Sequence, residues 1–421
     1  MPRGDRAQPP LRGDTAQPPL RGDTAQPRLS LNREQREAVE HGEGPLLVLA
    51  GAGSGKTRVL TARVARLIED GVPPARIFAV TFTNKAAGEM RERIAGLRGQ
   101  EARGLWIGTF HSLAARILRR EAEHTTRDRA FTIYDEDDSL RALKEVMEGA
   151  GLDPRRWSPG ALRSRISSAK NALVGPGDYA AGAYDLLARA VADVYPAYQK
   201  LLARRNAYDF DDLLFEAVRL LEGAGPVGER YADRFIHVLV DEYQDTNHAQ
   251  YRIVKALAGR HGNLCVVGDD DQSIYGWRGA DLRNILDFER DFPGAHVVRL
   301  EENYRSTASI LEVANAVIAC NVDRKPKRLR TEREGGEPIV VVRAADERRE
   351  ASWVAGTIER LGGRAAYGDC AVLYRTNAQS RAFEEAFGRA RIPYRIVGGV
   401  PFYQRREIRD VLAYLRLAVN P

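Results

Sequence analysis

The stretch that decides the fold is AGAGSGKT, residues 50–57, which has the GxxxxGKT spacing of a phosphate-binding loop. An apolar strand pattern at residues 46–49 precedes it, and a helical pattern at residues 59–68 follows it. Glycines at this spacing let backbone N–H groups turn toward an anion, and the helix that follows presents the positive end of its dipole. The stretch therefore predicts bound nucleoside triphosphate. The alternative is a glycine-rich turn that binds nothing.

Within this loop, the side chains suggest separate tasks. Lys56 is placed to reach the β- and γ-phosphates, and the Thr57 hydroxyl to hold Mg²⁺. The predicted ligands are thus ATP and Mg²⁺, and the predicted contacts are Ala50, Gly51, Ala52, Gly53, Ser54, Gly55, Lys56 and Thr57.

Length and composition set outer limits. The chain has 421 residues, enough for two or three domains with their own cores. No apolar run approaches the roughly 20 residues that cross a bilayer, so we expect no membrane partner. The net charge of +6 suits nucleic acid but is a weak signal. The cysteines, Cys265, Cys320 and Cys370, lack CxxC spacing, which favours a reducing cytoplasm over a disulfide framework or a zinc site.

The first 29 residues contain three copies of a nine-residue repeat, RGDRAQPPL, RGDTAQPPL and RGDTAQPRL. Units rich in Pro, Gly and polar residues bury too little apolar surface to order themselves, so residues 1–29 are predicted to be a disordered tail. The tail lacks the apolar centre of a secretory signal. Its RGD triplets could indicate adhesion, which is the weaker interpretation in a cytoplasmic chain.

Strand and helix patterns alternate after the phosphate loop, with strands at residues 77–82, 105–109, 235–240 and 264–267. This alternation predicts a parallel α/β sheet whose strands all end at one edge. Phe82, Thr83, Asn84, Phe110 and His111 follow two of these strands. Their polar groups could bind DNA phosphates while the phenylalanines stack on bases. Alternatively, the phenylalanines are core and the polar groups cap helices.

Residues 113–205 form a helical, Arg-rich insertion with one short strand at residues 131–134. Within it, LRSRISSAKN (residues 162–171) places Arg163, Arg165 and Lys170 among serines. This is either a phosphate-contacting face or an ordinary solvated one.

Acidic and aromatic residues follow the later strands. Asp241 and Glu242 end a buried strand, where a P-loop ATPase needs one acid for the Mg²⁺ shell and one to polarise the attacking water. The next loop, GDDDQSIYGWRGAD, holds Gln272, which can sense a γ-phosphate. It also holds the predicted DNA-stacking group Tyr275, Trp277 and Arg278.

Further strand patterns at residues 295–300, 338–342, 371–374 and 394–397 predict a second parallel α/β domain. From this domain, Arg305 could reach the γ-phosphate across a cleft, and Tyr304 could stack on the nucleotide base. At the start of the folded chain, the amide of Gln35 could bind the edge of adenine or simply face solvent.

Nine motifs in this order resemble those of superfamily-one DNA helicases of the UvrD/Rep type. They are LNREQ, AGAGSGKT, TFTNKAAGEM, GTFHSLAARIL, YDFDDLL, VDEYQDTN, VGDDDQSIYGWRGAD, LEENYRST and YRTNAQSR, and the likeness spans residues 31–421. The resemblance implies ATP-driven 3′ to 5′ translocation on single-stranded DNA, with unwinding at duplex junctions, in repair or replication. It also implies a RecA-like P-loop motor domain (30–112 and 206–293), an inserted helical subdomain (113–205) and a partial second RecA-like domain (294–421).

The resemblance assigns roles residue by residue. It implies adenine contact for Gln35, phosphate contact for Lys56, Mg²⁺ binding for Thr57 and Asp241, and nucleotide contact for Arg58. Glu242 becomes the catalytic base, Gln272 and Arg305 the γ-phosphate contacts, and Tyr304 the adenine-stacking ring. The implied DNA-stacking rings are Phe82, Phe210, Tyr275 and Trp277, with Arg278 beside them.

The sequence departs from the family in one respect. A VHxxKGLEF-like motif and a final TRA-like motif with its arginine do not occur in residues 1–421. We therefore expect an unpaired sheet edge, uncovered apolar surface, ATP and DNA binding, and poor hydrolysis and unwinding. The alternatives to a complete helicase are a nucleotide-gated DNA-binding module and the motor part of a helicase-nuclease. We expect a cytoplasmic, nucleoid-associated protein that acts as a monomer or a DNA-induced dimer, with partners among repair proteins.

Overall fold

The computed structural model describes residues 30–223, 225–362 and 365–397, and residues 407, 408, 410, 411 and 414. The predicted repeat tail at residues 1–29 lies outside them. The chain divides into two compact units, Met1–Glu337 and Pro338–Pro421.

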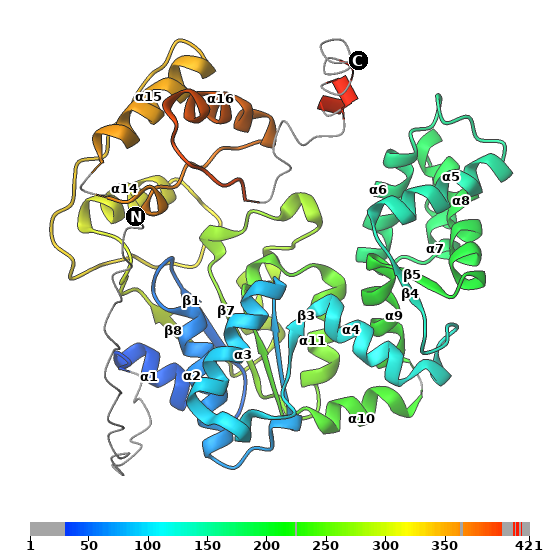
Figure 1. Cartoon of the computed structure of the whole chain (residues 1–421). Coiled ribbons are helices and arrows are strands. Elements are labelled where there is room, and N and C mark those ends of the chain that lie inside the picture. Colours follow the sequence, from blue (N-terminus) through cyan, green and yellow to red (C-terminus); the bar gives the residue numbers. More distant parts are fainter. Residues whose placement is uncertain are drawn as a thin grey trace, which may run out of the picture. The chain divides into compact units, whose positions relative to one another are not determined.

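The first unit is built on a six-stranded parallel sheet in the order β3-β2-β6-β7-β1-β8 (Figure 1). The strands are β1 (Leu46–Ala50), β2 (Ile77–Thr81), β3 (Trp106–Thr109), β6 (His237–Val240), β7 (Leu264–Gly268) and β8 (His296–Leu300). The predicted parallel α/β sheet is confirmed. Because every strand pair is parallel, all six carboxyl ends lie along one edge.

Helices cover both faces of this sheet (Figure 1). One face packs against α1 (Arg33–Glu40), α2 (Lys56–Glu69) and α3 (Asn84–Arg98), and the other against α4 (Phe110–Arg120), α9 (Phe210–Glu222), α10 (Pro226–Arg234) and α11 (His248–Ala258). In β1, the side chains of Leu46 and Val48 are buried on the face covered by α1, α2 and α3, while those of Leu47 and Leu49 are buried on the opposite face. This burial on both faces explains why the strands read as unbroken apolar runs.

A helical subdomain follows α4. It consists of β4 (Thr132–Tyr134), α5 (Glu136–Gly149), α6 (Pro159–Asn171), α7 (Pro176–Ala181), α8 (Leu186–Arg204) and β5 (Ala207–Asp209), and it has its own apolar core. The strand predicted at residues 131–134 is present and pairs in parallel with β5. The predicted boundary at residue 113 needs correction, because Leu113, Ile117 and Leu118 of α4 are buried in the core of the sheet.

The strand predicted to open the second domain belongs to the first sheet. β8 pairs with β1 from Leu46↔His296 to Ala50↔Leu300, so the chain is still within the first unit at residue 294. After β7 the unit continues through α12 (Arg283–Leu286) and α13 (Phe288–Asp291), and after β8 through α14 (Ala308–Ile318).

The second unit contains α15 (Glu347–Arg360) and α16 (Ser380–Ala390), which share an apolar core formed in part by Ala355, Phe383 and Phe387. The strands predicted at residues 338–342, 371–374 and 394–397 are not formed in the described part of the unit. A strand depends on backbone pairing with a neighbour, and these segments make no ladder with one another. Apolar side chains in them, including Val341 and Leu373, are exposed.

Candidate functional site

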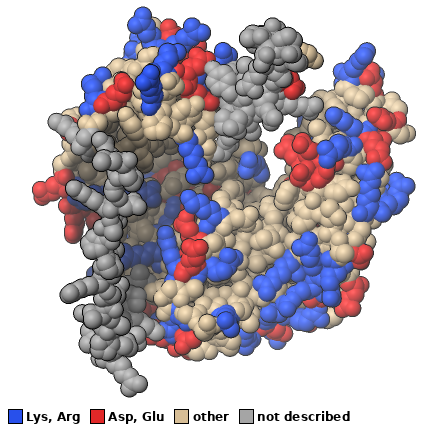
Figure 2. Space-filling view, viewed as in Figure 1, with Lys and Arg blue, Asp and Glu red and all other residues tan. Residues whose placement is uncertain are grey.

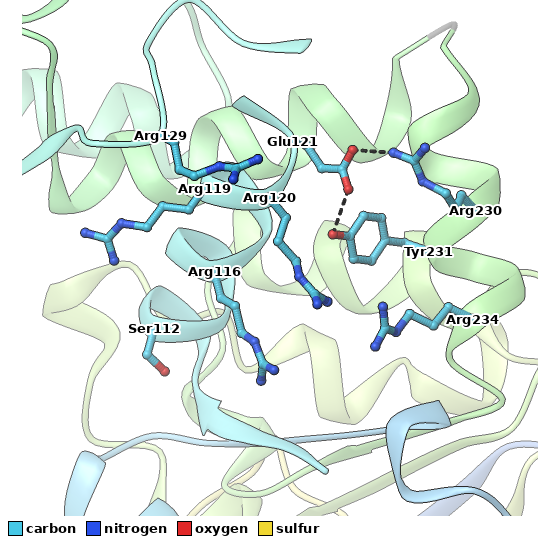
Figure 3. Close-up of a pocket in the computed structure, with 9 residues that line it drawn as sticks. All are labelled: Ser112, Arg116, Arg119, Arg120, Glu121, Arg129, Arg230, Tyr231 and Arg234. Carbon is cyan, nitrogen blue, oxygen red and sulfur yellow. Dashed lines mark hydrogen bonds and ion pairs between the residues drawn. The ribbon is translucent and has the colours of Figure 1, made fainter. Parts of the chain in front are cut away.

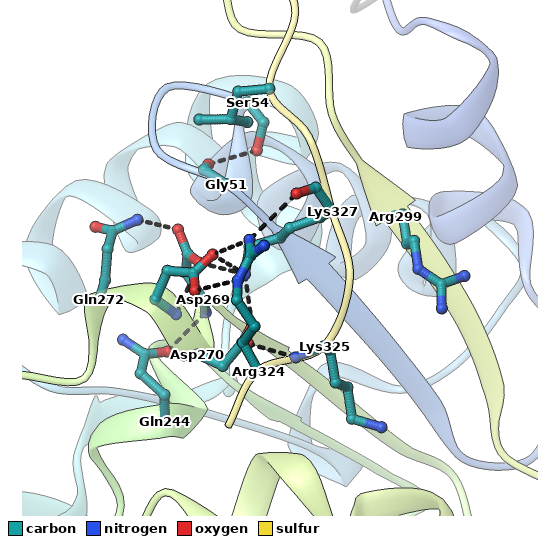
Figure 4. Close-up of polar contacts among 12 residues, drawn as sticks. Gly51, Ser54, Gln244, Asp269, Asp270, Gln272, Arg299, Arg324, Lys325 and Lys327 are labelled. Atoms are coloured by element: carbon teal, nitrogen blue, oxygen red, sulfur yellow. Dashed lines mark hydrogen bonds and ion pairs between the residues drawn. The ribbon is translucent and has the colours of Figure 1, made fainter. Parts of the chain in front are cut away.

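The phosphate loop connects β1 to α2 and is shaped by glycines. Gly53 and Gly55 have φ angles of 70° and 94°, in the left-handed region that favours glycine. A Cβ atom at Gly53 would lie 2.7 Å from Asn303 Nδ2, and one at Gly55 would lie 2.9 Å from Gln35 Nε2. Ser54 Oγ donates a 2.7 Å hydrogen bond to the Gly51 carbonyl within the same loop (Figure 4). The loop therefore has the shape of a phosphate cradle that a larger residue would disturb.

Lys56 opens α2 and is directed into the site. Its Nζ lies 3.3 Å from Glu242 Oε2. The same ammonium is buried and makes no hydrogen bond within the described residues. A buried ammonium that has one carboxylate 3.3 Å away and makes no hydrogen bond is left with unused donors, which is costly. Because phosphate oxygens would supply the missing acceptors, the residues present fit a triphosphate.

The acids after β6 fit a divalent cation. Burial raises the pKa of Asp241 to about 7, and the nearby charge of Glu242 adds to this effect. Glu242 itself has a φ of 50°, which is unfavourable for a residue with a side chain. The Asp241 carboxylate and the Thr57 hydroxyl are hard oxygen donors of the kind that Mg²⁺ prefers.

Gln244 connects the acids of β6 to the loop after β7, and sequence reasoning missed it. Its Nε2 donates to Glu242 Oε2 at 2.9 Å, and its Oε1 accepts from the Asp269 backbone N–H at 2.9 Å. The predicted γ-phosphate contact, Gln272, donates to the Asp269 carboxylate in this conformation (Figure 4).

Two cations, Lys327 and Arg324, also escaped sequence reasoning. Lys327 Nζ lies 2.9, 2.5 and 2.7 Å from carboxylate oxygens of Asp269, Asp270 and Asp271, respectively (Figure 4). Arg324 adds a two-point contact to Asp271 at 2.8 and 2.6 Å. Although burial opposes it, these ion pairs lower the pKa of Asp271. The basic run RKPKR at residues 324–328 was the available signal, but basic runs are usually solvated.

The segment after β8 is held against the phosphate loop. Asn303 is 1% exposed and donates through Nδ2 to the Ala52 carbonyl at 2.5 Å. The Tyr304 backbone N–H donates to the Gly53 carbonyl at 3.0 Å. These bonds place Tyr304 and the exposed Arg305 beside the loop. Asn303 is a positioning residue that the sequence did not reveal.

The predicted adenine contacts lie at the same place. Gln35 is buried and donates through Nε2 to the Ser54 carbonyl at 2.9 Å, so the alternative of a solvent-facing side chain is wrong. Asn32, the N-cap of α1, donates to the Tyr304 hydroxyl at 2.8 Å. Arg58 lies in the first turn of α2.

One group of predicted DNA-contacting residues comes together at the carboxyl ends of β2 and β7. The rings of Phe82 and Tyr275 are 4.8 Å apart, and those of Tyr275 and Trp277 are 6.4 Å apart. The Arg278 guanidinium lies 4.6 Å from the Trp277 ring centre. Trp277 is 69% exposed, which gives an open face for a base.

A second pair is His111 and Phe210, whose rings meet edge to face at 5.8 Å. Phe210 is 50% exposed. Burial lowers the pKa of His111 to about 4, so its imidazole is neutral at pH 7. Phe110 is 5% exposed and lies in the core of the sheet, so the alternative that this phenylalanine is a core residue holds.

Two further residues predicted to contact DNA, Thr83 and Asn84, lie at the start of α3. Thr83 accepts the Ala86 backbone N–H at 3.1 Å as the N-cap of α3, and Asn84 begins that helix. Both are exposed. The alternative of a capping role thus holds for Thr83, and exposure leaves its side chain and that of Asn84 accessible.

The phosphate-contacting face predicted at residues 162–171 is wrong for Lys170. Its Nζ is buried and lies 2.6 Å from Asp209 and 2.8 Å from Asp212. Arg163 pairs with Glu136 at 2.5 Å, and Arg165 is exposed. The sequence could not show that two acids about 40 residues further along the chain lie against Lys170.

The doubly covered parallel sheet and the glycine loop at its carboxyl edge define a P-loop nucleotide-binding protein of the RecA-like α/β class. Comparison with known proteins identifies the family. The UvrD/REP helicase N-terminal domain matches residues 31–293, and the UvrD-like helicase C-terminal domain matches residues 298–421. The chain belongs to the UvrD/Rep helicase family.

Curated relatives support this assignment. The ATP-dependent DNA helicase UvrD1 of Mycobacterium tuberculosis is 53% identical over 405 residues, which cover 93% of this chain and 52% of the relative. The ATP-dependent DNA helicase PcrA of Leuconostoc citreum is 52% identical over 395 residues, 93% of this chain and 53% of the relative. PcrA of Staphylococcus aureus is 50% identical over 394 residues, 93% and 54%. The chain spans about half the length of these relatives.

Proposed function

We propose that this chain is the ATP-binding part of a DNA helicase of repair or replication, which couples ATP hydrolysis to 3′ to 5′ movement along single-stranded DNA. Names of the relatives and the family match support a DNA helicase. The direction of movement rests on the family resemblance alone.

In this proposal the nucleotide lies along the edge formed by the carboxyl ends of β1, β6 and β7. Lys56 and the loop backbone bind the phosphates, and Thr57 and Asp241 are the residues that would hold Mg²⁺, whose charge would offset that of the phosphates. Glu242 orients and deprotonates the attacking water. Gln272 and Arg305 contact the γ-phosphate, whereas Gln35, Arg58 and Tyr304 contact the rest of the nucleotide.

The observation that carries the proposal is the loop after β7. It begins beside the phosphate loop, includes Gln272, and continues within five residues to the exposed Trp277. A change at the γ-phosphate can therefore reach a base-stacking ring through a short piece of backbone. Phe82 and Tyr275 extend the stacking surface, with His111 and Phe210 as a second contact and Thr83 and Asn84 as phosphate contacts. Phe110 supports this surface from the core.

DNA-stimulated ATP hydrolysis tests this proposal. Lys56→Ala should reduce hydrolysis at least 100-fold, because removing a preorganised charge that acts on the transferred phosphoryl group costs about this much. Trp277→Ala should keep basal hydrolysis and lose most of the stimulation by oligo-dT. Lys200→Ala and Tyr184→Ala, at exposed residues of the helical subdomain that have no role in the proposal, are the matched controls. Stimulation that survives in Trp277→Ala would contradict the stacking role.

Direction and setting need separate measurements. Partial duplexes with a 3′ or a 5′ single-stranded tail should distinguish polarity, and unwinding of the 5′-tailed substrate alone would contradict 3′ to 5′ movement.

We propose a cytoplasmic, nucleoid-associated protein acting as a monomer or DNA-induced dimer with repair proteins. In the described residues, no helix is long and apolar enough to span a membrane. We also propose that the second unit, Pro338–Pro421, contributes to a second RecA-like motor domain.

A further inference from the structure

A cavity of about 620 Å³ between α4 and α10 is lined mainly by arginines (Figure 3). The arginines are Arg116, Arg119, Arg120, Arg129, Arg230 and Arg234, and Glu121 is the one acid in the lining. Figure 2 shows Lys and Arg gathered on the surface where Figure 1 places α4 and α10. None of these residues has a part in the proposed nucleotide site.

Three of the guanidinium groups converge on one buried ring. Arg116, Arg120 and Arg234 lie 3.8, 5.3 and 5.0 Å from the centre of the Trp106 ring. Figure 3 shows Arg116 and Arg120 from α4 and Arg234 from α10 directed toward the same space. Stacking on an aromatic ring fixes a guanidinium plane while leaving its N–H edges free to donate hydrogen bonds.

The positive charge of this cavity is left largely unbalanced. Glu121 is already engaged by Arg230 and by the Tyr231 hydroxyl, the latter at 3.0 Å. Within the described part of the chain, the side chains of Arg116 and Arg120 make no hydrogen bond or ion pair. Burial and the neighbouring arginines lower the pKa of Arg116, which shows that these charges oppose one another. An anion in the cavity would relieve this repulsion and use the free donors.

The lining favours phosphate without bases. Trp106 and Tyr231 are buried at 0% and 3% exposure, so neither offers an open face for stacking. Sites for single strands combine positive charge with exposed aromatic rings, as around Trp277, whereas a duplex keeps its bases paired and presents phosphates. Ser112, Arg116 and Arg120 occupy successive turns of α4, which begins at the carboxyl edge of the sheet beside His111.

We propose that this arginine cavity binds the phosphate backbone of duplex DNA, as an anchor separate from the aromatic residues that contact the single strand. The identity of the ligand rests on the proposed function. The three guanidinium groups stacked on Trp106 contact phosphates without reading sequence.

Binding of a blunt-ended 16-base-pair DNA duplex to the full chain tests the anchor. Anisotropy would be followed over a series of salt concentrations, with saturating Mg²⁺ and a non-hydrolysable ATP analogue to fill the phosphate loop. Each phosphate contact contributes about 0.9 to the slope of log K against log salt. The double variant Arg116→Gln/Arg120→Gln should therefore lower the slope by about 2 and weaken binding about tenfold or more at low salt.

Matched variants separate the site from general charge and from folding. Arg66→Gln/Arg93→Gln removes two exposed charges from α2 and α3 and should leave the slope unchanged. Arg116→Lys/Arg120→Lys keeps the charge and should retain most of the slope, and thermal unfolding of each variant verifies the fold. An unchanged slope in the glutamine variant would overturn the proposal, as would an equal loss of duplex affinity in Trp277→Ala.

A third arm distinguishes the source of phosphate. Inorganic tripolyphosphate should compete only weakly with the duplex, because it reaches fewer of the arginines. Tight tripolyphosphate binding that depends on Arg116 and Arg120, without a duplex effect, would overturn the assignment to DNA. None of these binding measurements involves ATP hydrolysis. If the chain lacked DNA-stimulated ATPase activity but the salt dependence of duplex binding still required Arg116 and Arg120, the proposed function would be contradicted while the duplex-binding proposal would hold.

Discussion

Gly53 shows how single residues shape the phosphate loop. It combines a φ of 70° with close packing against Asn303 Nδ2 and Arg305 Cβ, which a Cβ atom would approach to 2.7 and 2.8 Å. Both the backbone strain and the contact oppose any side chain here.

Gly53→Ala should therefore destabilise the first unit by about 1–3 kcal/mol and weaken ATP binding, because the loop must move away from the segment after β8. Gly42→Ala, at a glycine with nothing within 4 Å of the added Cβ, is the control. Urea unfolding and titration with a fluorescent ATP analogue would measure both effects. A Gly53→Ala protein that binds nucleotide like the wild type would show that the loop geometry is not required.

His237 makes the stability depend on pH. Burial, together with the charges of Arg63 and His261, lowers its pKa to about 4. Between pH 4 and 6.5 the unfolded chain binds a proton that the folded chain does not, so the free energy of unfolding rises with pH and this contribution is complete above pH 6.5.

We expect His237→Gln to remove up to about 1.4 kcal/mol per pH unit from the slope of stability against pH in that window. The comparison with wild type cancels the titration of carboxylates and of His111. Urea unfolding at several pH values from 4.5 to 7.5 would provide the slopes. Parallel curves for the two proteins would show that His237 accepts a proton while folded.

At the scale of elements, the segment from Arg324 to Arg330 holds the loop after β7 in place. The Lys327 side chain is 3% exposed and pairs with Asp269, Asp270 and Asp271, while the Lys325 backbone N–H donates to Asp270 at 2.8 Å. The same segment brings Leu329 against Gly51 of the phosphate loop. It therefore joins both loops that flank the proposed γ-phosphate position.

Lys327→Met should destabilise the first unit by about 3–5 kcal/mol, because removal of one partner leaves buried charges unpaired. Lys325→Met removes only a side-chain pair with the half-exposed Glu289 and should cost less than about 1 kcal/mol. Urea unfolding of both variants measures the difference. Equal, small losses would mean that water already screens the three carboxylates.

At the scale of the whole first unit, a buried polar network joins the helical subdomain to the sheet core. Lys170 of α6 contacts Asp209 and Asp212 at the start of α9, and the Tyr198 hydroxyl of α8 donates to Asp209 at 3.0 Å. Asn171 then bridges to Asp211 at 2.8 Å and accepts from Asn247, the N-cap of α11, at 2.6 Å.

Lys170→Met should loosen the helical subdomain as a body, because two carboxylates lose their shared cation at the junction. Hydrogen exchange should accelerate in α5, α6 and α8 more than in β1 or β7. Arg165→Met, an exposed cation on the same helix, is the control. Uniform acceleration throughout the unit would instead place the network within the global core.

A feature of this protein could be predicted from the sequence when the residues that produce it lie close together in the chain. The phosphate loop, the alternation of strands and helices and the acids after β6 are local patterns, and the strands predicted for the first sheet formed. Tyr275 and Trp277 were predicted to be exposed because large aromatic residues among glycines are rarely core, and Trp277 is 69% exposed. Lys327, Gln244 and the arginine cavity were missed, because each depends on partners that lie far apart in sequence.

The sequence by itself determined the class of sheet, the nucleotide loop and the family, because glycine spacing and apolar periodicity act over a few residues. Only the tertiary structure decided that β8 is an edge strand of the first sheet, that Lys170 and Lys327 are buried counter-ions, and that three arginines meet at Trp106. The sequence lists the charged residues but does not show which charges become neighbours, because these neighbours are set by folding. Burial in the folded chain then decides whether each charge is solvated, paired or available for a ligand.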